Sequence, residues 1–200
     1  MVRIRLARES DTEAIVAIYA PFVAQTVISF ETLPPGPDEM RRRVVETTAA
    51  YPWLVCELDG AVVGYAYASQ HRARAAYRWS VDTSAYIDPA QHRRGVGRGL
   101  YASLFEILRA QGFCNAYAGI TLPNAASVGL HEAVGFKRLG VYERVGHKFG
   151  AWHDVGWWQL ALQARSENPG EPLSLPTVMA RPDWERMVHA GETAVRAHAG

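Results

Sequence analysis

The chain has 200 residues, of which 48% are hydrophobic, enough to form the core of one domain. Its formal net charge of +1 argues against a general attraction to nucleic acid. No apolar run is long enough to cross a bilayer, and the N-terminus does not resemble a signal peptide. Cys56 and Cys114 lie in apolar, strand-like surroundings, which favours two buried thiols over a disulfide. We therefore expect a cytoplasmic protein with no membrane or nucleic-acid partner.

The first quarter of the chain predicts one strand and two helices. Residues 2–6 alternate apolar and basic side chains, as a half-buried strand does. Ser10 and Glu13 have the spacing of a capping box. Apolar residues follow at helical spacing until Pro21, which should end or bend the helix. After a proline-rich loop, residues 38–50 predict the second helix.

Strands dominate the remaining pattern up to residue 163. Two apolar runs are joined by Asp59-Gly60, a strong hairpin signal. A helix rich in leucine follows a glycine-rich loop and should end at Gly112. A short helix should end near Gly135. The expected strands cover 53–58, 61–69, 80–88, 113–120, 137–145 and 155–162.

This order of elements indicates a mixed α/β or α+β fold with a central sheet. We expect one domain over residues 1–163. Residues 164–200 differ in composition, with prolines that mark a linker and then the pattern of a short helix. The sequence leaves open whether this tail docks or stays loose, and Trp184 favours docking because its ring needs cover.

The segment 92–101 reads HRRGVGRGLY, with arginines and glycines directly ahead of an apolar helical pattern. Such glycines let backbone amides approach a ligand, and the first N–H groups of a helix carry the positive end of its dipole. With the arginine charges, the segment predicts a phosphate cradle. The alternative is a solvated basic turn whose glycines allow tight packing. The spacing fits neither a dinucleotide-binding motif nor a P-loop.

Motifs around this loop resemble the GNAT superfamily of N-acetyltransferases. Residues 86–89 (YIDP), followed by the spaced glycines and an amphipathic helix, resemble its acetyl-CoA signature, and residues 122–136 resemble the second half of that signature. Three further segments resemble the phosphinothricin and methionine sulfoximine branch, namely 26–32, 73–88 and 146–160. The resemblance covers residues 1–163 and implies a twisted, mostly antiparallel central sheet, splayed at the acetyl-CoA site and flanked by helices.

The resemblance implies a set of acetyl-CoA-binding residues: Ala85, Tyr86, Ile87, Arg93, Arg94, Gly95, Val96, Gly97, Arg98, Gly99, Asn124 and Ser127. The strand residues would pair with the pantetheine arm through their backbone, and the loop would hold the pyrophosphate. Asn124 resembles a family asparagine that bonds the pantetheine arm, with a plain turn residue as the alternative. His92 departs from the family pattern, which usually has Gln or Arg there. Because backbone amides do most of the binding, we still expect a site here.

The catalytic residues implied by the resemblance are Asp82 and His131. Asp82 stands where the branch has a glutamate that acts as general base, and it would act directly or through a water. His131 stands near the coenzyme sulfur and would protonate the thiolate or hold a water. The alternatives are a solvent-facing carboxylate and a structural histidine. His131-Glu132 lacks the second histidine of a zinc-protease motif, so we predict no metal.

Four residues are candidates for binding the acceptor: Phe30, Arg72, Arg74 and Tyr77. The two guanidinium groups and the phenol suit the carboxylate and the phosphinate or sulfoximine oxygens of a glutamate-like amino acid. A charged solvent loop is the alternative interpretation. The leading hypothesis is therefore an acetyl-CoA-dependent N-acetyltransferase acting on such an amino acid.

Two other functions stay open, namely acetylation of another amine and a non-catalytic acyl-CoA-binding sensor. A polyamine enzyme would have an acidic pocket, whereas the candidate pocket is basic. The branch and the aromatic segment around Trp152, Trp157 and Trp158 predict a homodimer, although core packing also explains these tryptophans.

Overall fold

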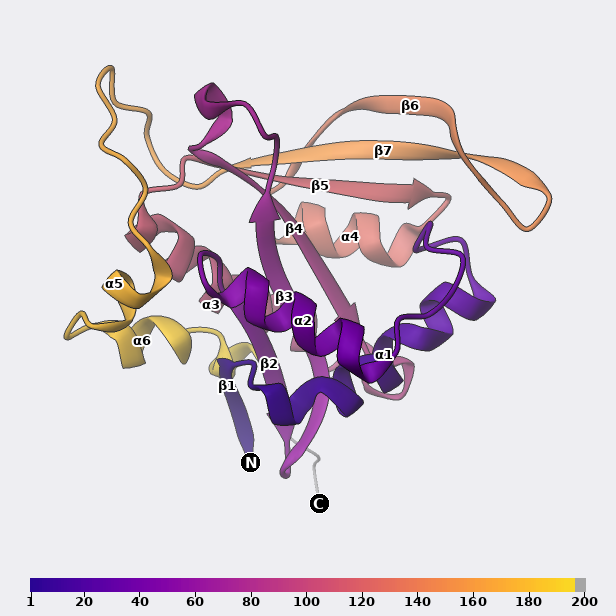
Figure 1. Ribbon diagram of the computed structural model, residues 1–200, viewed down its shortest axis with the longest axis horizontal. Coiled ribbons are helices and arrows are strands. Elements are labelled where there is room, and N and C mark those ends of the chain that lie inside the picture. Colours follow the sequence, from indigo (N-terminus) through magenta and orange to yellow (C-terminus); the bar gives the residue numbers. More distant parts are fainter. Residues whose placement is uncertain (197–200) are drawn as a thin grey trace.

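The structure is a computed structural model that describes residues 1–196, and its framework is a seven-stranded sheet with the order β1-β2-β3-β4-β5-β7-β6 (Figure 1). All neighbouring strands are antiparallel except β4 and β5. The strands are β1 (Val2–Leu6), β2 (Trp53–Leu58), β3 (Ala61–Gln70), β4 (Ser80–Ile87), β5 (Asn115–Leu122), β6 (Lys137–Lys148) and β7 (Ala151–Ala161). The expected mixed fold with a mostly antiparallel sheet is confirmed.

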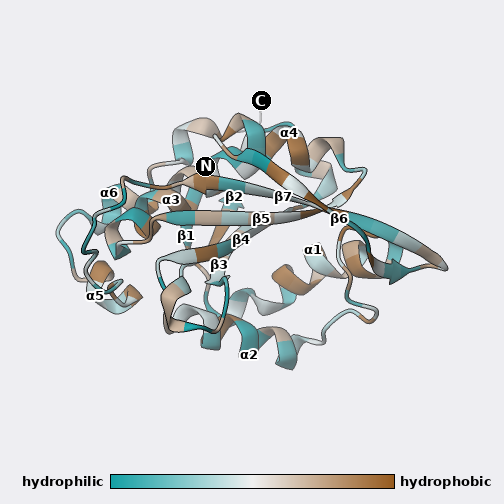
Figure 2. Cartoon of the chain, turned by 90° about the horizontal axis from the view of Figure 1, so that it is seen from above, coloured by the Kyte–Doolittle hydropathy of each residue, from teal (hydrophilic) through white to brown (hydrophobic). Residues whose placement is uncertain are grey.

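Helices cover both faces of the sheet. Those of the main body are α1 (Thr12–Gln25), α2 (Pro37–Thr48), α3 (Val96–Gln111) and α4 (Ala125–Ala133). Seen from above, α1 and α2 lie on one face and α3 and α4 on the other (Figure 2). The two faces have separate cores, one under α1 and α2 around Trp53 and Tyr65, and a larger one around α3.

The sheet opens between β4 and β5. These parallel strands pair only over Ser80–Asp82 and Asn115–Tyr117. Beyond Asp82 they diverge, and β5, β6 and β7 run across the direction of β1 to β4 (Figure 1). The β5-side edge of β4 is left without a partner strand from Thr83 onward within the described residues, whereas its other edge stays paired with β3. The splay therefore exposes backbone groups of β4 at the centre of the molecule.

The start of α1 differs from the capping box expected at Ser10 and Glu13. A 3₁₀ turn covers Glu9–Asp11, and the Arg8 backbone N–H donates to Asp11 Oδ2 at 2.7 Å. The helix also does not end at Pro21 but continues to Gln25. Residues on both sides of the proline, including Tyr19 and Val23, are buried, so packing against the sheet outweighs the lost backbone hydrogen bond.

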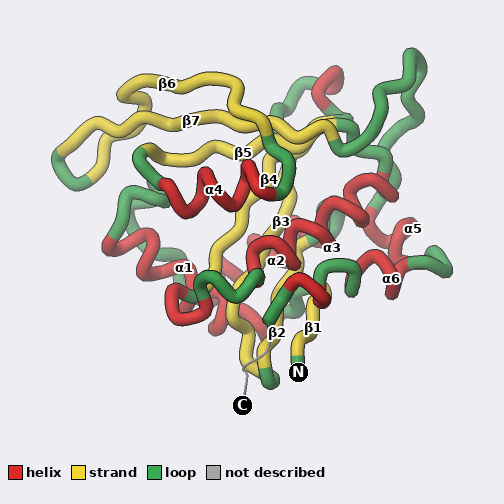
Figure 3. Tube along the Cα trace, turned by 180° about the vertical axis from the view of Figure 1, so that it is seen from behind, coloured by secondary structure: helices red, strands yellow, loops and turns green. Residues whose placement is uncertain are grey.

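The C-terminal segment, residues 164–196, folds back onto the rest of the chain and forms two short helices, α5 (Leu175–Met179) and α6 (Trp184–Val188) (Figure 3). Its buried apolar side chains join the core around α3, and they are Leu175, Val178, Met187, Val188 and Val195. The Gly191 N–H donates to Ser103 Oγ at 3.0 Å, and Glu192 Oε1 accepts from the Ile4 N–H at 2.8 Å. The segment thus shares the larger core.

Cys56 and Cys114 are free and buried, as predicted, and burial raises the pKa of the Cys56 thiol to about 12. Over residues 1–196, no helix has the length and apolar character needed to span a membrane.

Candidate active site

The glycine-rich loop ends at the N-terminus of α3. Gly95 is the N-cap with φ +83°, a left-handed conformation that favours glycine, and α3 begins at Val96. The first N–H groups of this 16-residue helix lack intrahelical partners, so the helix presents donors and its positive dipole end at the loop. Arg93 and Arg98 are exposed beside these donors. The geometry is that of an anion-binding helix terminus.

The glycines of this loop also permit close packing, which was the alternative interpretation of the sequence. A Cβ at Gly95 would overlap the carbonyl oxygen of Ala194. A Cβ at Gly97 would lie 2.8 Å from Leu130 Cδ2. At Gly99 it would lie 2.7 Å from the Gly191 carbonyl oxygen. Thus α4 and the C-terminal segment approach α3 at a distance that side chains would prevent.

A cavity of about 610 Å³ lies between the end of β4, the start of α3 and α4. His131 lines it, and so do ten of the twelve residues that the sequence assigned to acetyl-CoA. These ten are Ala85, Tyr86, Ile87, Arg93, Gly95, Val96, Gly97, Arg98, Asn124 and Ser127. Gly99 and Arg94 do not line the cavity. Gly99 is covered by the C-terminal segment, and the Arg94 guanidinium donates to the Arg196 carbonyl oxygen at 2.9 and 3.2 Å.

Two residues from the C-terminal segment line the same cavity, Ala194 and Arg196. The Arg196 backbone N–H donates to the Arg94 carbonyl oxygen at 2.9 Å, which fastens the segment to the loop. The sequence pattern contained no signal for this contact, because about 100 residues separate the two partners.

Asn124 and His131 are held in fixed geometry beside the cavity. Asn124 is the N-cap of α4, and its Oδ1 accepts from the Ser127 N–H at 3.1 Å. His131 is buried, with Nδ1 2.7 Å from the Ser127 carbonyl oxygen and Nε2 2.8 Å from the Tyr101 hydroxyl. A carbonyl can only accept, so Nδ1 carries the proton and Nε2 accepts from Tyr101. Burial lowers the pKa of His131, which agrees with a neutral ring.

Asp82 lies at the point where β4 and β5 separate, since it is the last residue of β4 that pairs with β5. Its Oδ1 is 2.7 Å from Nδ1 of His71, the residue that follows β3. Burial raises the pKa of Asp82, and the hydrogen bond to His71 opposes this effect. No motif of the sequence singles out His71; the antiparallel register of β3 and β4, which pairs Gln70 with Val81, brings it beside Asp82.

The four acceptor candidates are only partly brought together. Tyr77 contacts the His71 ring edge-on with centroids 5.9 Å apart, and Arg72 lies over the Trp157 ring at 5.9 Å. Arg74 is exposed and starts the turn before β4. Phe30 packs instead against the β6–β7 hairpin, where a Cβ at Gly146 would overlap its ring.

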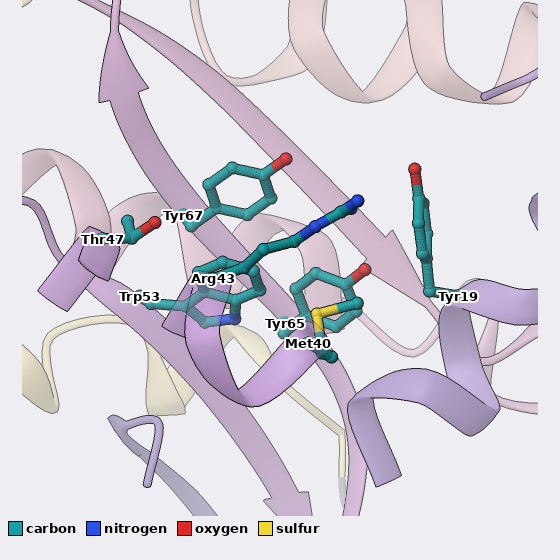
Figure 4. A pocket seen from close by; sticks show the side chains of 7 residues that line it. All are labelled: Tyr19, Met40, Arg43, Thr47, Trp53, Tyr65 and Tyr67. Atoms are coloured by element: carbon teal, nitrogen blue, oxygen red, sulfur yellow. The ribbon is translucent and has the colours of Figure 1, made fainter. Parts of the chain in front are cut away.

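A smaller cavity of about 120 Å³ lies under α1 and α2 (Figure 4). It is lined by Tyr19, Met40, Arg43, Thr47, Trp53, Tyr65 and Tyr67. Arg43 extends from α2 over its aromatic wall, and its guanidinium is paired with Glu31 at 2.7 Å and Glu39 at 2.8 Å. Asp82, Arg72 and Tyr77 do not line this cavity. Because the arginine charge is already neutralised, an anionic ligand gains little here.

The family profile described as "Acetyltransferase (GNAT) domain" matches residues 4–157. The chain belongs to the GNAT acetyltransferase family. The phosphinothricin N-acetyltransferase of Streptomyces viridochromogenes is 40% identical over 158 residues, covering 79% of this chain and 86% of that protein. The L-methionine sulfoximine/L-methionine sulfone acetyltransferase of Salmonella typhimurium is 35% identical, covering 80% of this chain and 94% of that protein.

A solved structure supports the same assignment. The phosphinothricin acetyltransferase of Sinorhizobium meliloti in complex with acetyl-CoA superposes with a TM-score of 0.78 at 34% identity. The similarity covers 84% of this chain and 95% of that one. The fold of this GNAT acetyltransferase and its acetyl-CoA-dependent N-acetyltransferase activity follow from this agreement.

The cavity of this GNAT acetyltransferase has the features that acetyl-CoA requires. Its α3 end presents backbone donors and two arginines, which suit a pyrophosphate, and its β4 wall presents unpaired backbone groups, which suit an amide-containing arm. Within residues 1–196, no group of three or more His, Cys, Asp or Glu side chains could hold a metal ion.

Proposed function

We propose that this GNAT acetyltransferase transfers the acetyl group of acetyl-CoA to the amino group of a small glutamate-like amino acid, of the phosphinothricin or methionine sulfoximine type. The observation that carries the substrate class is the cluster of Arg72, Tyr77 and Asp82 around His71 at the opening of the sheet. A guanidinium and a phenol recognise acidic oxygens, and a carboxylate receives the ammonium. The names of the two curated relatives support the same class.

In this proposal the coenzyme lies along the 610 Å³ cavity. The N-terminal amides of α3, with Arg93 and Arg98, bind the pyrophosphate. The free edge of β4 at Ala85, Tyr86 and Ile87 pairs with the pantetheine amides as an added strand would. Asn124, whose Oδ1 is occupied by its capping bond, offers its amide N–H groups to the same arm.

The chemistry requires loss of a proton from the acceptor ammonium before the nitrogen attacks. Acetyl-CoA supplies the thioester. Asp82 lies at the end of the splay, and in this proposal the acetyl group and the amine meet beside it, so that it takes part in removing this proton. Burial raises the pKa of Asp82, so the carboxylate attracts a proton or a protonated neighbour more strongly.

We propose a positioning role for His131. Both of its ring nitrogens are engaged, with the Ser127 carbonyl and the Tyr101 hydroxyl. The ring therefore holds Tyr101 and the first turn of α4 against the cavity. Its Nδ1 proton is hydrogen-bonded to the Ser127 carbonyl, so His131 has no free proton to donate directly to the thiolate. His131→Gln, which retains the contact to Tyr101 through its amide, should then keep more activity than His131→Ala.

Association through the β6–β7 hairpin is part of the proposal. Trp158 is buried in the core, whereas Trp152 is 63% exposed. Other large apolar side chains of the hairpin are also exposed, namely Leu139, Tyr142, Val145 and Phe149. An apolar surface of this kind favours burial against a second copy, so we propose a homodimer.

An amine panel tests the proposed function. Purified protein is mixed with acetyl-CoA and single amines, and thiol release is followed optically. Phosphinothricin and methionine sulfoximine should give the highest kcat/KM, with glutamate, a polyamine and a peptide N-terminus as competitors. A preference for the polyamine, or thiol release independent of any amine, would exclude the proposed substrate class.

A further inference from the structure

His71 occupies the acceptor side of the sheet opening, directly after the last residue of β3. Its ring stacks on Tyr117 of β5, with centroids 4.3 Å apart and planes 14° from parallel. Tyr77 contacts the ring edge-on. The side chain is 11% exposed, and that of Asp82 is 29% exposed. Three elements thus clamp the imidazole in one orientation beside the carboxylate, while a small part of the ring stays accessible.

The hydrogen bond defines the tautomer of the ring. A carboxylate oxygen accepts, so the 2.7 Å contact between Asp82 Oδ1 and His71 Nδ1 requires the proton on Nδ1. In the neutral ring, Nε2 then carries the lone pair. No hydrogen bond joins this Nε2 to any residue in the part of the chain that the structure describes, in contrast to His131, where both nitrogens are engaged.

We propose that His71 is the group that accepts the ammonium proton, through Nε2, and that Asp82 orients its ring and stabilises the imidazolium. The inference deepens the proposed function and rests on it. Imidazole is the side chain that most often serves as a general base, and Nε2 of His71 is the ring nitrogen with no hydrogen-bond partner among the described residues. An Asp–His pair also extends the reach of the short aspartate by the length of a ring.

In the proposed reaction, an ammonium and a thioester yield an amide, a free thiol and one proton. The ammonium transfers one proton to Nε2 of His71, and the nitrogen lone pair forms a bond to the thioester carbonyl carbon. The C–S bond then breaks, and its electron pair leaves on sulfur. The second proton of the attacking nitrogen passes to the thiolate, which gives the amide and free thiol. His71 finally releases its proton to solvent, and no oxidant, reductant or metal is required.

The groups that face His71 are those that an imidazolium formed during the reaction would contact. Asp82 of β4 contributes a negative charge, and Tyr117 and Tyr77 contribute uncharged rings. Arg72 supplies the nearby positive charge, and it acts to lower the pKa of Asp82. The Arg72 guanidinium also donates to the His71 carbonyl oxygen at 3.0 Å, which keeps this positive charge close to the histidine.

The alternative is that Asp82 is the base and His71 only holds it, and His71→Asn separates the two. The asparagine amide can donate to Asp82 as Nδ1 does, but it has no basic nitrogen at the Nε2 position. If His71 is the base, kcat should fall by about 10²-fold or more and the rise of rate with pH should be lost, whereas the Kd for acetyl-CoA by calorimetry stays unchanged. His189→Asn, at the end of α6, is the matched control: His189 faces Glu185 and Glu192 and does not line the coenzyme cavity, so the variant should retain wild-type kinetics.

Nitrogen-15 NMR of histidine-labelled enzyme gives a second readout that needs no substrate. We expect the His71 signals, identified by their loss in His71→Asn, to report a proton on Nδ1 and a bare Nε2, and Asp82→Asn to abolish this preference. Retention of kcat within a few-fold in His71→Asn would overturn the proposal, as would a proton on Nε2. If the wild type acetylates no amine of the panel, the proposed function fails, and the tautomer still decides whether the Asp–His pair exists.

Discussion

The contact between the C-terminal segment and the glycine-rich loop makes a quantitative prediction for Gly95→Ala. Gly95 has φ +83°, and an alanine in this left-handed region costs about 1–2 kcal/mol. The new methyl group would also overlap the Ala194 carbonyl oxygen, a backbone atom that cannot move without shifting the segment. Overpacking of this kind costs about 1–3 kcal/mol more.

Gly60→Ala provides the control, because Gly60 has φ +86° but no atom within 4 Å of the added Cβ. Gly60→Ala should therefore lose only the folding free energy that the left-handed backbone conformation costs an alanine. In a chain of this size, 1 kcal/mol shifts Tm by about 2–4 °C. Because overpacking costs Gly95→Ala an additional ~1–3 kcal/mol, we expect its Tm to lie about 2–12 °C below that of Gly60→Ala in calorimetry without coenzyme. Limited proteolysis should also cleave Gly95→Ala first near Ala194. Equal melting temperatures of the two variants would refute the packing argument.

Four further outcomes are expected. Gly97→Val should weaken acetyl-CoA binding at least about 10-fold in calorimetry, because its side chain would fill the space beside the α3 amides; unchanged binding would remove the loop from the site. Asp82→Asn should keep that affinity but lower kcat about 10²-fold, and full turnover would exclude the carboxylate from catalysis. Burial acts to raise the pKa of Asp11, but hydrogen bonds from Arg5 hold this pKa below 3.8. The ionised carboxylate therefore stabilises the fold at neutral pH, and this stabilisation is lost as the pH falls through the pKa of the folded state. The difference in urea midpoint between wild type and Asp11→Asn should accordingly narrow from pH 7 to pH 3. Light scattering at micromolar concentration should give a dimer that Trp152→Glu converts to a monomer; a monomeric wild type would contradict the proposed homodimer.

Local patterns were sufficient to predict most elements. The Asp59-Gly60 dipeptide joins β2 and β3 as predicted, with both residues at positive φ. Gly112 ends α3 in the left-handed conformation, as expected. Alternation and helical spacing depend on neighbours within a few residues, so the sequence contains their signal directly. Pro21 was expected to end or bend α1, and the helix instead continues through it to Gln25, because packing of α1 against the sheet outweighs the local preference.

The sequence by itself determined the family, and it predicted the loop that precedes α3 and the candidate acetyl-CoA-binding positions, because the residues of each motif are continuous in the chain. Only the tertiary structure decided which residues meet across the sheet. Strand register places His71 against Asp82, and the splay of β4 from β5 leaves the edge of β4 free. The C-terminal segment closes over Gly95 and Gly99 about 100 residues away. These contacts arise from burial of apolar surface shared by distant segments, and no local spacing encodes such a contact.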